Sequence, residues 1–373
     1  MKTIPGSVLI TGGAGFIGSH LAEELLRAGW QVRVLDILDP QVHRARRRPD
    51  YLNKRVELVV GDVRRRETVR QALHGIDAVC HLAAAVGVGQ SMYEIERYAS
   101  VNDIGTAVLL EALTDSGVRR LLVASSMSIY GEGRAFGPCG IVDPPERSAA
   151  QVKAGRWELE TPEGETLDPV PTPETKLPAL SSIYALNKYT QERMCLIFGR
   201  AYDVPVTALR FFNVYGPYQA LSNPYTGVLA IFGSRLLNGK PPLIFEDGRQ
   251  RRDFVHVRDV ARACRLALEA PDAAGQVINV GSGQSRTVCE VAYALAAATG
   301  RTDIEPCCTG RYRAGDIRHC FADISLARRL LAFRPAVAFD DGIAEFADWL
   351  STQVAVDRVD DATSELARRG LVV

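Results

Sequence analysis

The sequence predicts an α/β protein built on a Rossmann-type, doubly wound parallel sheet, with a smaller C-terminal substrate-binding lobe. Two features of the chain predict this fold. Short β-branched runs alternate with amphipathic stretches through the first half, which is the pattern of strand-helix units. After residue 216, glycines and prolines interrupt that alternation, which returns only near residue 276.

Apolar periodicity assigns the strands and helices in chain order. Short apolar runs predict strands at residues 8–11, 31–36, 56–62, 77–83, 121–125 and 206–212, with a return to the sheet at 276–281. Apolar repeats of helical spacing predict helices at residues 16–28, 101–116 and 182–202. Because strand-helix-strand crossovers are right-handed, such helices cover both faces of one sheet.

The 373 residues are enough for two lobes, each using two stretches of the chain. The expected division is 1–216 with 253–282 for the lobe of the sheet, and 217–252 with 283–350 for the smaller lobe. Residues 137–180 form an irregular insertion rich in proline and glycine, and a loop this long is usually functional or disordered. Residues 351–373 are expected to be a peripheral tail.

Charge and composition exclude several classes of partner. Lys and Arg together number 44, as do Asp and Glu, so no overall field attracts nucleic acid or an anionic membrane. Residues 1–7 lead directly into a strand, so no secretory signal is expected, and no apolar run reaches the roughly 20 residues of a membrane span. The eight cysteines form no C-x-x-C pair, so we expect reduced thiols, no metal and a cytoplasmic location.

A glycine-rich turn follows the first predicted strand. Gly12, Gly15 and Gly18 give the spacing G-x-x-G-x-x-G, and Phe16 and Ile17 begin the next helix. Glycines let the backbone approach a pyrophosphate without Cβ interference, while the helix offers free N–H groups and its positive dipole end. The glycines and the first helical residues therefore predict a dinucleotide cofactor site.

The acidic residue that ends the second predicted strand selects among dinucleotides. Asp36 lies 18 positions after Gly18, where a carboxylate can accept hydrogen bonds from the adenosine ribose hydroxyls. The same carboxylate repels a 2′-phosphate, so NAD is favoured over NADP. The basic run at 44–48 could instead clamp such a phosphate, but we interpret it as a solvated face.

The ends of the third and fourth predicted strands complete the expected cofactor surface. Asp62 and Val63 are candidates for the adenine side, with an exposed strand-end aspartate as the alternative for Asp62. Leu82, Ala83 and Ala84 end the next strand, where open parallel sheets bind their ligands. These three could equally be packing residues.

A second group of residues suggests chemistry for the cofactor. Tyr184 and Lys188 are four positions apart and thus on one face of a helix. A phenol with a pKa near 10 needs that pKa lowered to act as a base at neutral pH, and an adjacent ammonium does this. Ser126 ends the preceding strand, where its hydroxyl can bind the reacting oxygen. These three are the candidate catalytic residues, and Tyr184 and Lys188 are also cofactor candidates.

Together, in this order, these motifs resemble the extended short-chain dehydrogenase/reductase superfamily, in particular its NAD-dependent epimerase/dehydratase family acting on nucleotide sugars. The resemblance covers about residues 5–345. Matching segments are V-N-D-I-G-T at 101–106, R-F-F-N-V-Y-G-P at 210–217, R-D-F-V-H-V-R-D at 252–259 and R-A-G-D at 313–316. The family's base matches Tyr184, its serine matches Ser126, and Lys188 would also bind the nicotinamide ribose.

The resemblance also implies residues that bind the substrate. Asn213, Arg252 and Arg313 would contact the diphosphate of a nucleotide sugar and Asp316 its ribose, while Asn102 would belong to the cofactor site. Arginine forks suit phosphate oxygens, and a chain of zero net charge needs a local anion site. Surface ion pairing is the alternative for either arginine.

The two residues that follow the catalytic serine distinguish the reactions of the family. Its 4,6-dehydratases carry acidic residues there, and its decarboxylases commonly keep one. Met127 and Ser128 stand there in this chain, and neither is a strong acid or base at neutral pH. We therefore favour C4 epimerisation of a nucleotide-activated hexose through a transient 4-keto intermediate, with Met127 and Ser128 near the sugar. The alternatives are a dehydratase or decarboxylase with acids from elsewhere, and a non-catalytic NAD-binding sensor.

Substrate and assembly are less constrained by the sequence. The runs at 126–133 and 219–228 look most like bacterial dTDP-L-rhamnose 4-epimerases, which interconvert dTDP-L-rhamnose and dTDP-6-deoxy-L-talose. A UDP-glucose or UDP-glucuronate 4-epimerase stays open, because base recognition can use backbone atoms near Leu243 and Phe245. A homodimer through helices flanking the sheet is implied by the resemblance. Residues 137–168 would be a flap over the sugar, an oligomer contact or a passive excursion.

Overall fold

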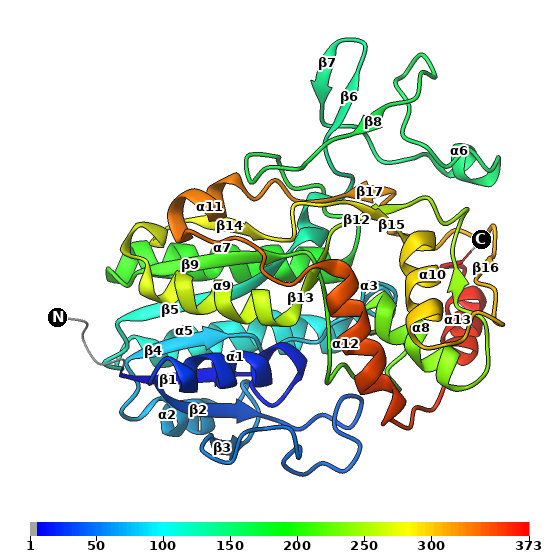
Figure 1. Ribbon diagram of the computed structural model, residues 1–373. Helices are drawn as coiled ribbons and strands as arrows, with labels where there is room; N and C mark the ends of the chain where they lie inside the picture. Colours follow the sequence, from blue (N-terminus) through cyan, green and yellow to red (C-terminus); the bar gives the residue numbers. More distant parts are fainter. Residues whose placement is uncertain (1–5, 373) are drawn as a thin grey trace.

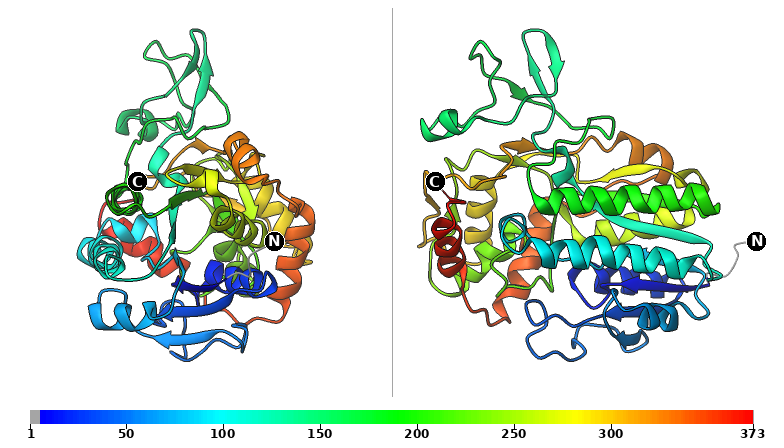
Figure 2. Two further views of the ribbon diagram at one scale, coloured as in Figure 1. Left: turned by 90° about the vertical axis from the view of Figure 1, so that its left-hand side faces the viewer. Right: turned by 180° about the vertical axis from the view of Figure 1, so that it is seen from behind.

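The structure is a computed structural model that describes residues 6–372 (Figure 1). Residues 1–5, which belong to the stretch without an expected secretory signal, lie outside the described residues. The body of the molecule is one twisted sheet with helices on both faces, flanked by a group of helices at the carboxyl ends of the strands. A projection formed by the insertion stands away from this body (Figures 1 and 2).

Seven parallel strands form the central sheet, which confirms the predicted fold class. In spatial order they are β14 (Val277–Val280), β9 (Val206–Phe211), β5 (Arg120–Ser126), β4 (Ala78–His81), β1 (Ser7–Thr11), β2 (Gln31–Asp36) and β3 (Glu57–Val60). The chain runs outward from β1 to β3 and then returns to β4 on the other side of β1. This reversal opens a crevice at the carboxyl end of β1, where such sheets bind ligands.

Two apolar cores lie on opposite faces of the sheet. One core contains buried residues of α1 (Phe16–Arg27), α9 (Val257–Glu269) and α11 (Ser325–Leu331). The other contains those of α2 (Arg66–Leu73), α5 (Gly105–Leu113) and α7 (Ile183–Tyr202). The helix expected over 101–116 is divided, because a π-helical segment, η1 (Ala99–Ile104), precedes α5. The short helices α3 (Val88–Ser91) and α4 (Ile95–Tyr98) lead into it.

The second lobe has its own core, built from α8 (Val228–Leu237), α10 (Val288–Ala298) and α12 (Phe339–Ser351). A capping box formed by Thr287 and Glu290 fixes the start of α10. Short strands join this lobe to the body; they are β10 (Asn213–Tyr215) with β13 (Phe254–His256), β11 (Leu243–Ile244) with β16 (Cys307–Cys308), and β12 (Arg251–Arg252) with β15 (Arg286–Thr287) and β17 (His319–Cys320). A 3₁₀ turn, η3 (Pro271–Ala273), precedes β14.

The insertion contains more regular structure than its composition suggests. After the 3₁₀ turn η2 (Met127–Tyr130) come β6 (Ala135–Gly137), β7 (Gly140–Val142), the short helix α6 (Ala149–Lys153) and β8 (Asp168–Pro169). The last helix is α13 (Val359–Arg368), in the segment expected to be a tail. The buried side chain of Leu366 lies beside Gly89, and the carbonyl of Leu371 accepts a hydrogen bond from the amide of Ala314 at 2.8 Å.

Searches over the described residues give three further findings. No helix among residues 6–372 has the length and apolarity needed to cross a membrane. Within that same range, no group of three or more His, Cys, Asp or Glu side chains is arranged to hold a metal ion. All eight cysteines are free thiols.

Candidate active site

The predicted cofactor and catalytic residues meet at one edge of the sheet. Strands β1, β2, β4 and β5 run parallel, so the segments that follow them emerge side by side. The glycine turn follows β1, Asp36 ends β2, and Ser126 ends β5. Helix α7 packs against β5 and brings Tyr184 and Lys188 to this edge.

The glycine turn is shaped for a phosphate group. Gly12 has φ +70° and a Cβ there would lie 2.8 Å from the amide nitrogen of Ala83. A Cβ on Gly18 would lie 2.5 Å from the carbonyl oxygen of Gly12, so both glycines are required by packing. A Cβ on Gly15, by contrast, would meet only that carbonyl, at 3.4 Å. The space in front of Gly15 is therefore open to a ligand.

The first turn of α1 presents free amides to that space. Gly15 is the N-cap and has no side chain to satisfy them, and the first turn holds no acidic residue. Phe16 and Ile17 follow the cap and are partly exposed. Such an uncapped helix N-terminus binds anions. The turn thus fits the pyrophosphate of a dinucleotide.

Asp36 braces the same turn from the neighbouring strand. Its carboxylate accepts the amide of Ala14 at 3.0 Å on one oxygen and the amide of Leu38 at 2.8 Å on the other. Each oxygen keeps a second lone pair for a ribose hydroxyl. Of the basic run, Arg44, Arg46 and Arg47 are exposed to solvent, as expected for a solvated face.

The adenine-side candidates lie at the ends of β3 and β4. Asp62 pairs with Arg64 at 2.6 Å, and although burial acts in the other direction, this partner holds the pKa of Asp62 below its usual value. Val63 is buried against Gly105. Leu82, Ala83 and Ala84 are partly exposed. The strand ends therefore offer an apolar surface beside one carboxylate.

Asn102 has a different position from the one that a direct cofactor contact requires. Its side chain is fully buried, and its amide oxygen and nitrogen bind the amide and carbonyl of Ala85 at 2.8 and 3.1 Å. The residue therefore fixes the segment that follows β4 from behind.

Ser126 and Tyr184 are both buried, and the Ser126 hydroxyl lies near enough to Tyr184 to lower the pKa of the phenol. Ser126 is 7% exposed and Tyr184 is 9% exposed. Burial acts more strongly and raises the pKa of Tyr184 to about 12. The amide of Tyr184 donates to Ser91 Oγ at 3.1 Å, which fixes the start of α7.

Lys188 is buried one helical turn after Tyr184 on α7. Its ammonium donates to Gln191 Oε1 at 2.8 Å, and burial lowers its own pKa to about 8. An ammonium has three N–H donors. Those that Gln191 leaves free fit the hydroxyls of a nicotinamide ribose.

A chain of buried hydrogen bonds continues from Lys188 to the glycine turn. Gln191 Nε2 donates to Thr106 Oγ1 at 2.8 Å, and that hydroxyl lies 2.9 Å from His81 Nε2. The other ring nitrogen of His81 lies 2.7 Å from Thr11 Oγ1. Burial and the charge of Lys188 lower the pKa of His81 to about 3, so the ring is neutral. The chain ties the candidate catalytic lysine to the strand that carries the cofactor turn.

The two positions after Ser126 lie in different surroundings. Met127 is buried in a small apolar cluster that includes Tyr130, Phe212 and Ile317, so it is a packing residue and does not face the sugar. Ser128 is partly exposed, and Ser126 Oγ donates to its hydroxyl at 3.1 Å. Neither position supplies a carboxylate.

Three of the substrate candidates, Arg313, Asp316 and Phe245, lie close together. Arg313 forms a two-fold contact with Asp316, at 2.7 and 3.1 Å, and its guanidinium lies 5.4 Å from the ring of Phe245. Leu243 is in β11, two residues before that ring. The buried Oδ1 atom of Asn213 has no hydrogen-bond partner in the described residues. Arg313 and Asp316 thus form a polar pair beside the ring of Phe245.

Arg252 is the substrate-binding candidate whose guanidinium has no carboxylate partner among the described residues. Its guanidinium donates to the carbonyls of Arg251 and Arg318, at 3.0 and 2.9 Å, and to that of Ile317. No carboxylate of residues 6–372 forms a salt bridge with it. A cation held only by carbonyls is suited to an anionic ligand.

We expect the substitution Arg252→Met to weaken substrate binding selectively. A hydrogen bond to a charged group contributes about 1.5–3 kcal/mol, so KM should rise roughly 10- to 100-fold while kcat changes little. Steady-state kinetics with a nucleotide sugar measures both. Arg251→Met is the matched control, because Arg251 is exposed and, among the described residues, its guanidinium donates only to Ser285. Equal KM values for the two variants would contradict the assignment.

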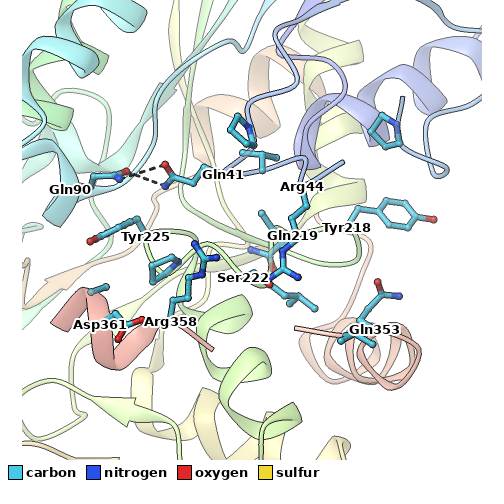
Figure 3. A pocket seen from close by; sticks show the side chains of 18 of the residues that line it. Gln41, Arg44, Gln90, Tyr218, Gln219, Ser222, Tyr225, Gln353, Arg358 and Asp361 are labelled. Atoms are coloured by element: carbon cyan, nitrogen blue, oxygen red, sulfur yellow. Dashed lines mark hydrogen bonds between the residues drawn. The ribbon is translucent and has the colours of Figure 1, made fainter. Parts of the chain in front are cut away.

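Three amide side chains form a hydrogen-bonded bridge between the segments that follow β2 and β4. Gln41, after β2, donates to Gln90 of α3 at 3.1 Å (Figure 3). It also donates to Asn223 at 2.9 Å. Since β1 lies between β2 and β4 in the sheet, a bridge from the segment after β2 to α3, after β4, passes the end of β1. We call Gln41, Gln90 and Asn223 the clasp. It links the segment after β2 to α3 and to residue 223.

A cavity of about 1170 Å³ opens beside the clasp, between the segment after β2, residues 218–225 and helices α12 and α13 (Figure 3). Arg44, Tyr218 and Arg358 are among its lining residues. None of the sequence-predicted cofactor, catalytic or substrate residues lines it. The cavity is therefore separate from Ser126, Tyr184 and Lys188.

Sequence reasoning missed several side chains that hold the site. Gln191 is one helical turn after Lys188, so helical spacing could have indicated it. Ser91 contacts the amide of Tyr184 across 93 positions, and Arg147 contacts the carbonyl of Asp316 across 169. No periodicity or motif signals contacts of that separation.

Comparisons with known proteins give a consistent result. A family model described as NAD dependent epimerase/dehydratase family matches residues 8–151 and 159–281. The chain is 37% identical to a dTDP-L-rhamnose 4-epimerase of Burkholderia thailandensis over 355 residues, which cover 93% of this chain and 95% of the relative.

Solved structures extend the similarity to the fold. A Thermus thermophilus UDP-glucose 4-epimerase in complex with NAD has 33% identity and a TM-score of 0.73, covering 93% of this chain and 100% of the other. A Bacillus cereus UDP-glucuronic acid 4-epimerase in complex with UDP-glucuronic acid and NAD has 27% identity and a TM-score of 0.75. The latter match covers 92% of this chain and 99% of the other.

Proposed function

Because this chain belongs to the NAD dependent epimerase/dehydratase family, we propose that it catalyses NAD-dependent 4-epimerisation of a nucleotide-activated hexose. The observation that carries the proposal is the buried hydroxyl pair of Ser126 and Tyr184 beside the dinucleotide turn, with no carboxylate at positions 127 and 128. A single base with a bound oxidant suffices for epimerisation. Elimination of water needs further proton carriers.

Each side chain of the site has one role in this reaction. Tyr184 takes the proton of the C4 hydroxyl and returns it, while Ser126 hydrogen-bonds the same oxygen and holds it in place. NAD supplies the two-electron acceptor that removes hydride from C4 and gives it back to either face. Lys188 holds the nicotinamide ribose with the N–H donors that Gln191 leaves free. The 4-keto sugar must rotate between the two transfers, so its contacts with the protein must be few.

The diphosphate anchors the substrate while the sugar rotates. Arg252 and Arg313 are the two guanidinium groups at the substrate surface, and the planar guanidinium suits phosphate oxygens. Binding would exchange the internal pair of Arg313 and Asp316 for contacts with phosphate and ribose. Asn213 and the segment around Leu243 and Phe245 would complete the nucleotide contacts.

We favour dTDP-L-rhamnose and dTDP-6-deoxy-L-talose as the substrate pair. The support is the 37% identity to a relative named for that reaction, over most of both chains. UDP-glucose and UDP-glucuronate are the competing substrates, since 4-epimerases named for them share the fold.

Incubation with a panel of dTDP- and UDP-hexoses tests the proposal. NMR of the product should show inversion at C4, and mass spectrometry should show no change in mass. Loss of water or carbon dioxide would establish a dehydratase or decarboxylase instead. Binding of NAD without turnover of any panel member would favour the sensor.

We expect the enzyme to purify with NAD bound. Epimerisation returns the cofactor to its starting state, and the clasp must open before the dinucleotide can leave. Gln41→Ala removes the hydrogen bonds to Gln90 and Asn223 and should accelerate release of the cofactor, measured by exchange against labelled NAD after gel filtration. Gln353→Ala, at a partly exposed glutamine outside the clasp, is the control. An empty, freely exchanging wild-type site would contradict this expectation.

We also propose that the protein is a cytoplasmic homodimer that pairs through α7. On that helix, Leu186 and Ile197 are 44% and 53% exposed, and their spacing places them on one face. Exposed large apolar residues on a common helix face are typical of interfaces. Light scattering after gel filtration measures the mass. The free cysteines are compatible with a reducing compartment.

A further inference from the structure

The insertion is fastened to the body by a deeply buried arginine. The side chain of Arg147 is only 2% exposed and its guanidinium lies 2.8 Å from Glu246 Oε1. It also lies 3.4 Å from Glu132 Oε1 and donates to the carbonyl of Asp316 at 3.2 Å. The ring of Tyr312 is 5.4 Å away. The guanidinium of Arg147, in the insertion, therefore contacts Glu246 and Asp316 in the segments that carry the substrate candidates.

A second charged side chain of the insertion makes a matching contact. Glu158 accepts from Arg318 Nη2 at 2.5 Å and lies 2.7 Å from His319 Nε2. Although burial acts in the other direction, these two partners lower the pKa of Glu158 to about 2. Glu158 is therefore ionised across the physiological range of pH.

The body side of this cluster is not neutral by itself. Glu132 and Glu246 are 4% and 2% exposed, and Asp247 stands beside them. Arg318, fully buried, pairs with Glu246, Asp247 and Glu158. Burial raises the pKa of both glutamates, and the charge of Arg147 is the strongest opposing influence. Removing Arg147 would take away one of the cations that balance these buried carboxylates, which is costly.

The cluster lies directly behind the nucleotide surface. Glu246 follows Phe245 in the chain and has φ +56°, a left-handed conformation that a non-glycine residue keeps only when its surroundings enforce it. Its amide donates to the carbonyl of Arg311 at 2.8 Å. Arg147 therefore connects the two segments that carry Phe245 and Asp316.

We propose that Arg147 and Glu158 are positioning residues for nucleotide recognition, so that the insertion is an integral part of the nucleoside diphosphate site. By pairing with the buried cluster, they hold residues 243–246 and 312–316 in the geometry that binds the nucleotide. This inference rests on the proposed function. The hairpin of β6 and β7 stands away from the cleft, so the base of the insertion, not its tip, contacts the site (Figure 1).

The test measures binding and turnover separately on the NAD-loaded enzyme. Calorimetric titration with dTDP and with UDP should show that Arg147→Met weakens nucleotide binding about tenfold or more, because a small displacement of a binding group is enough for such a loss. KM should rise in parallel, with little change in kcat and in bound NAD. Arg147→Lys should recover part of the affinity.

Arg156→Met is the matched control, since Arg156 lies in the same insertion, is 61% exposed and pairs only with Glu160. If Arg147→Met melts earlier but binds both nucleotides like Arg156→Met, the proposal is overturned. Should Arg147→Met fail to fold, the near-isosteric Glu158→Gln decides, because wild-type affinity in that variant also overturns it. Wild-type enzyme that binds dTDP or UDP without epimerising any sugar would refute only the proposed function.

Discussion

Replacement of Tyr184 by phenylalanine is expected to reduce kcat by about a thousandfold or more, with the fold, bound NAD and substrate affinity retained. The change removes one hydroxyl, and a positioned general base contributes roughly 100- to 10,000-fold. No second base lies beside Ser126, since positions 127 and 128 hold Met and Ser. Coupled NMR assays of C4 inversion measure the loss.

Tyr130→Phe provides the control for this substitution. Tyr130 is another fully buried tyrosine near the same strand, and its hydroxyl donates to Asn279 Oδ1 at 2.7 Å. Its loss should lower stability without a comparable loss of turnover. Tyr184→Phe enzyme with near wild-type kcat would refute the mechanism.

Replacement of Lys188 by methionine should lower kcat by about a hundredfold or more and yet stabilise the protein. The activity falls because the ammonium that holds the ribose and is linked to the glycine turn is lost. The stability rises because burial lowers the pKa of Lys188 from 10.5 to about 8, so the folded protein pays for keeping this ammonium ionised at neutral pH. That shift corresponds to at most about 3 kcal/mol.

The sign of the pH dependence follows from proton uptake. Between pH 8 and 10.5 the lysine is neutral in the folded chain and protonated in the unfolded chain, so unfolding binds a proton and stability rises with pH. The gain in Tm of Lys188→Met should therefore be largest near pH 7 and shrink above pH 8. Melting curves at saturating NAD measure it. A gain that grows with pH would contradict the assigned pKa.

The sequence predicted the sheet well because its signals are local. The strand limits agree with the structure to within two residues, since buried parallel strands are short apolar runs between turns. The glycine turn and its helix were predicted for the same reason. Where side-chain contacts decide the backbone, prediction was less accurate, as at η1, where Asn102 turns inward to Ala85.

The candidate site was predicted as a set of residues but not as a set of contacts. The order of motifs indicated Ser126, Tyr184 and Lys188 as one group, and the structure places all three as buried residues at the end of β5 and in the first half of α7. The partner of Lys188 could not be read from spacing alone, because several buried acceptors compete for one ammonium. The link between Arg147 and residues 312–316 depends on how the insertion folds back, which no local pattern determines.

The clasp of Gln41, Gln90 and Asn223 has a consequence for metabolism. An enzyme that keeps its dinucleotide between turnovers does not draw on the cellular pool, and its flux does not depend on the ratio of oxidised to reduced NAD in that pool. Sugar interconversion would then respond to the supply of nucleotide sugar alone. Three amide side chains at one edge of the sheet would thus separate this step of sugar metabolism from the redox state of the cell.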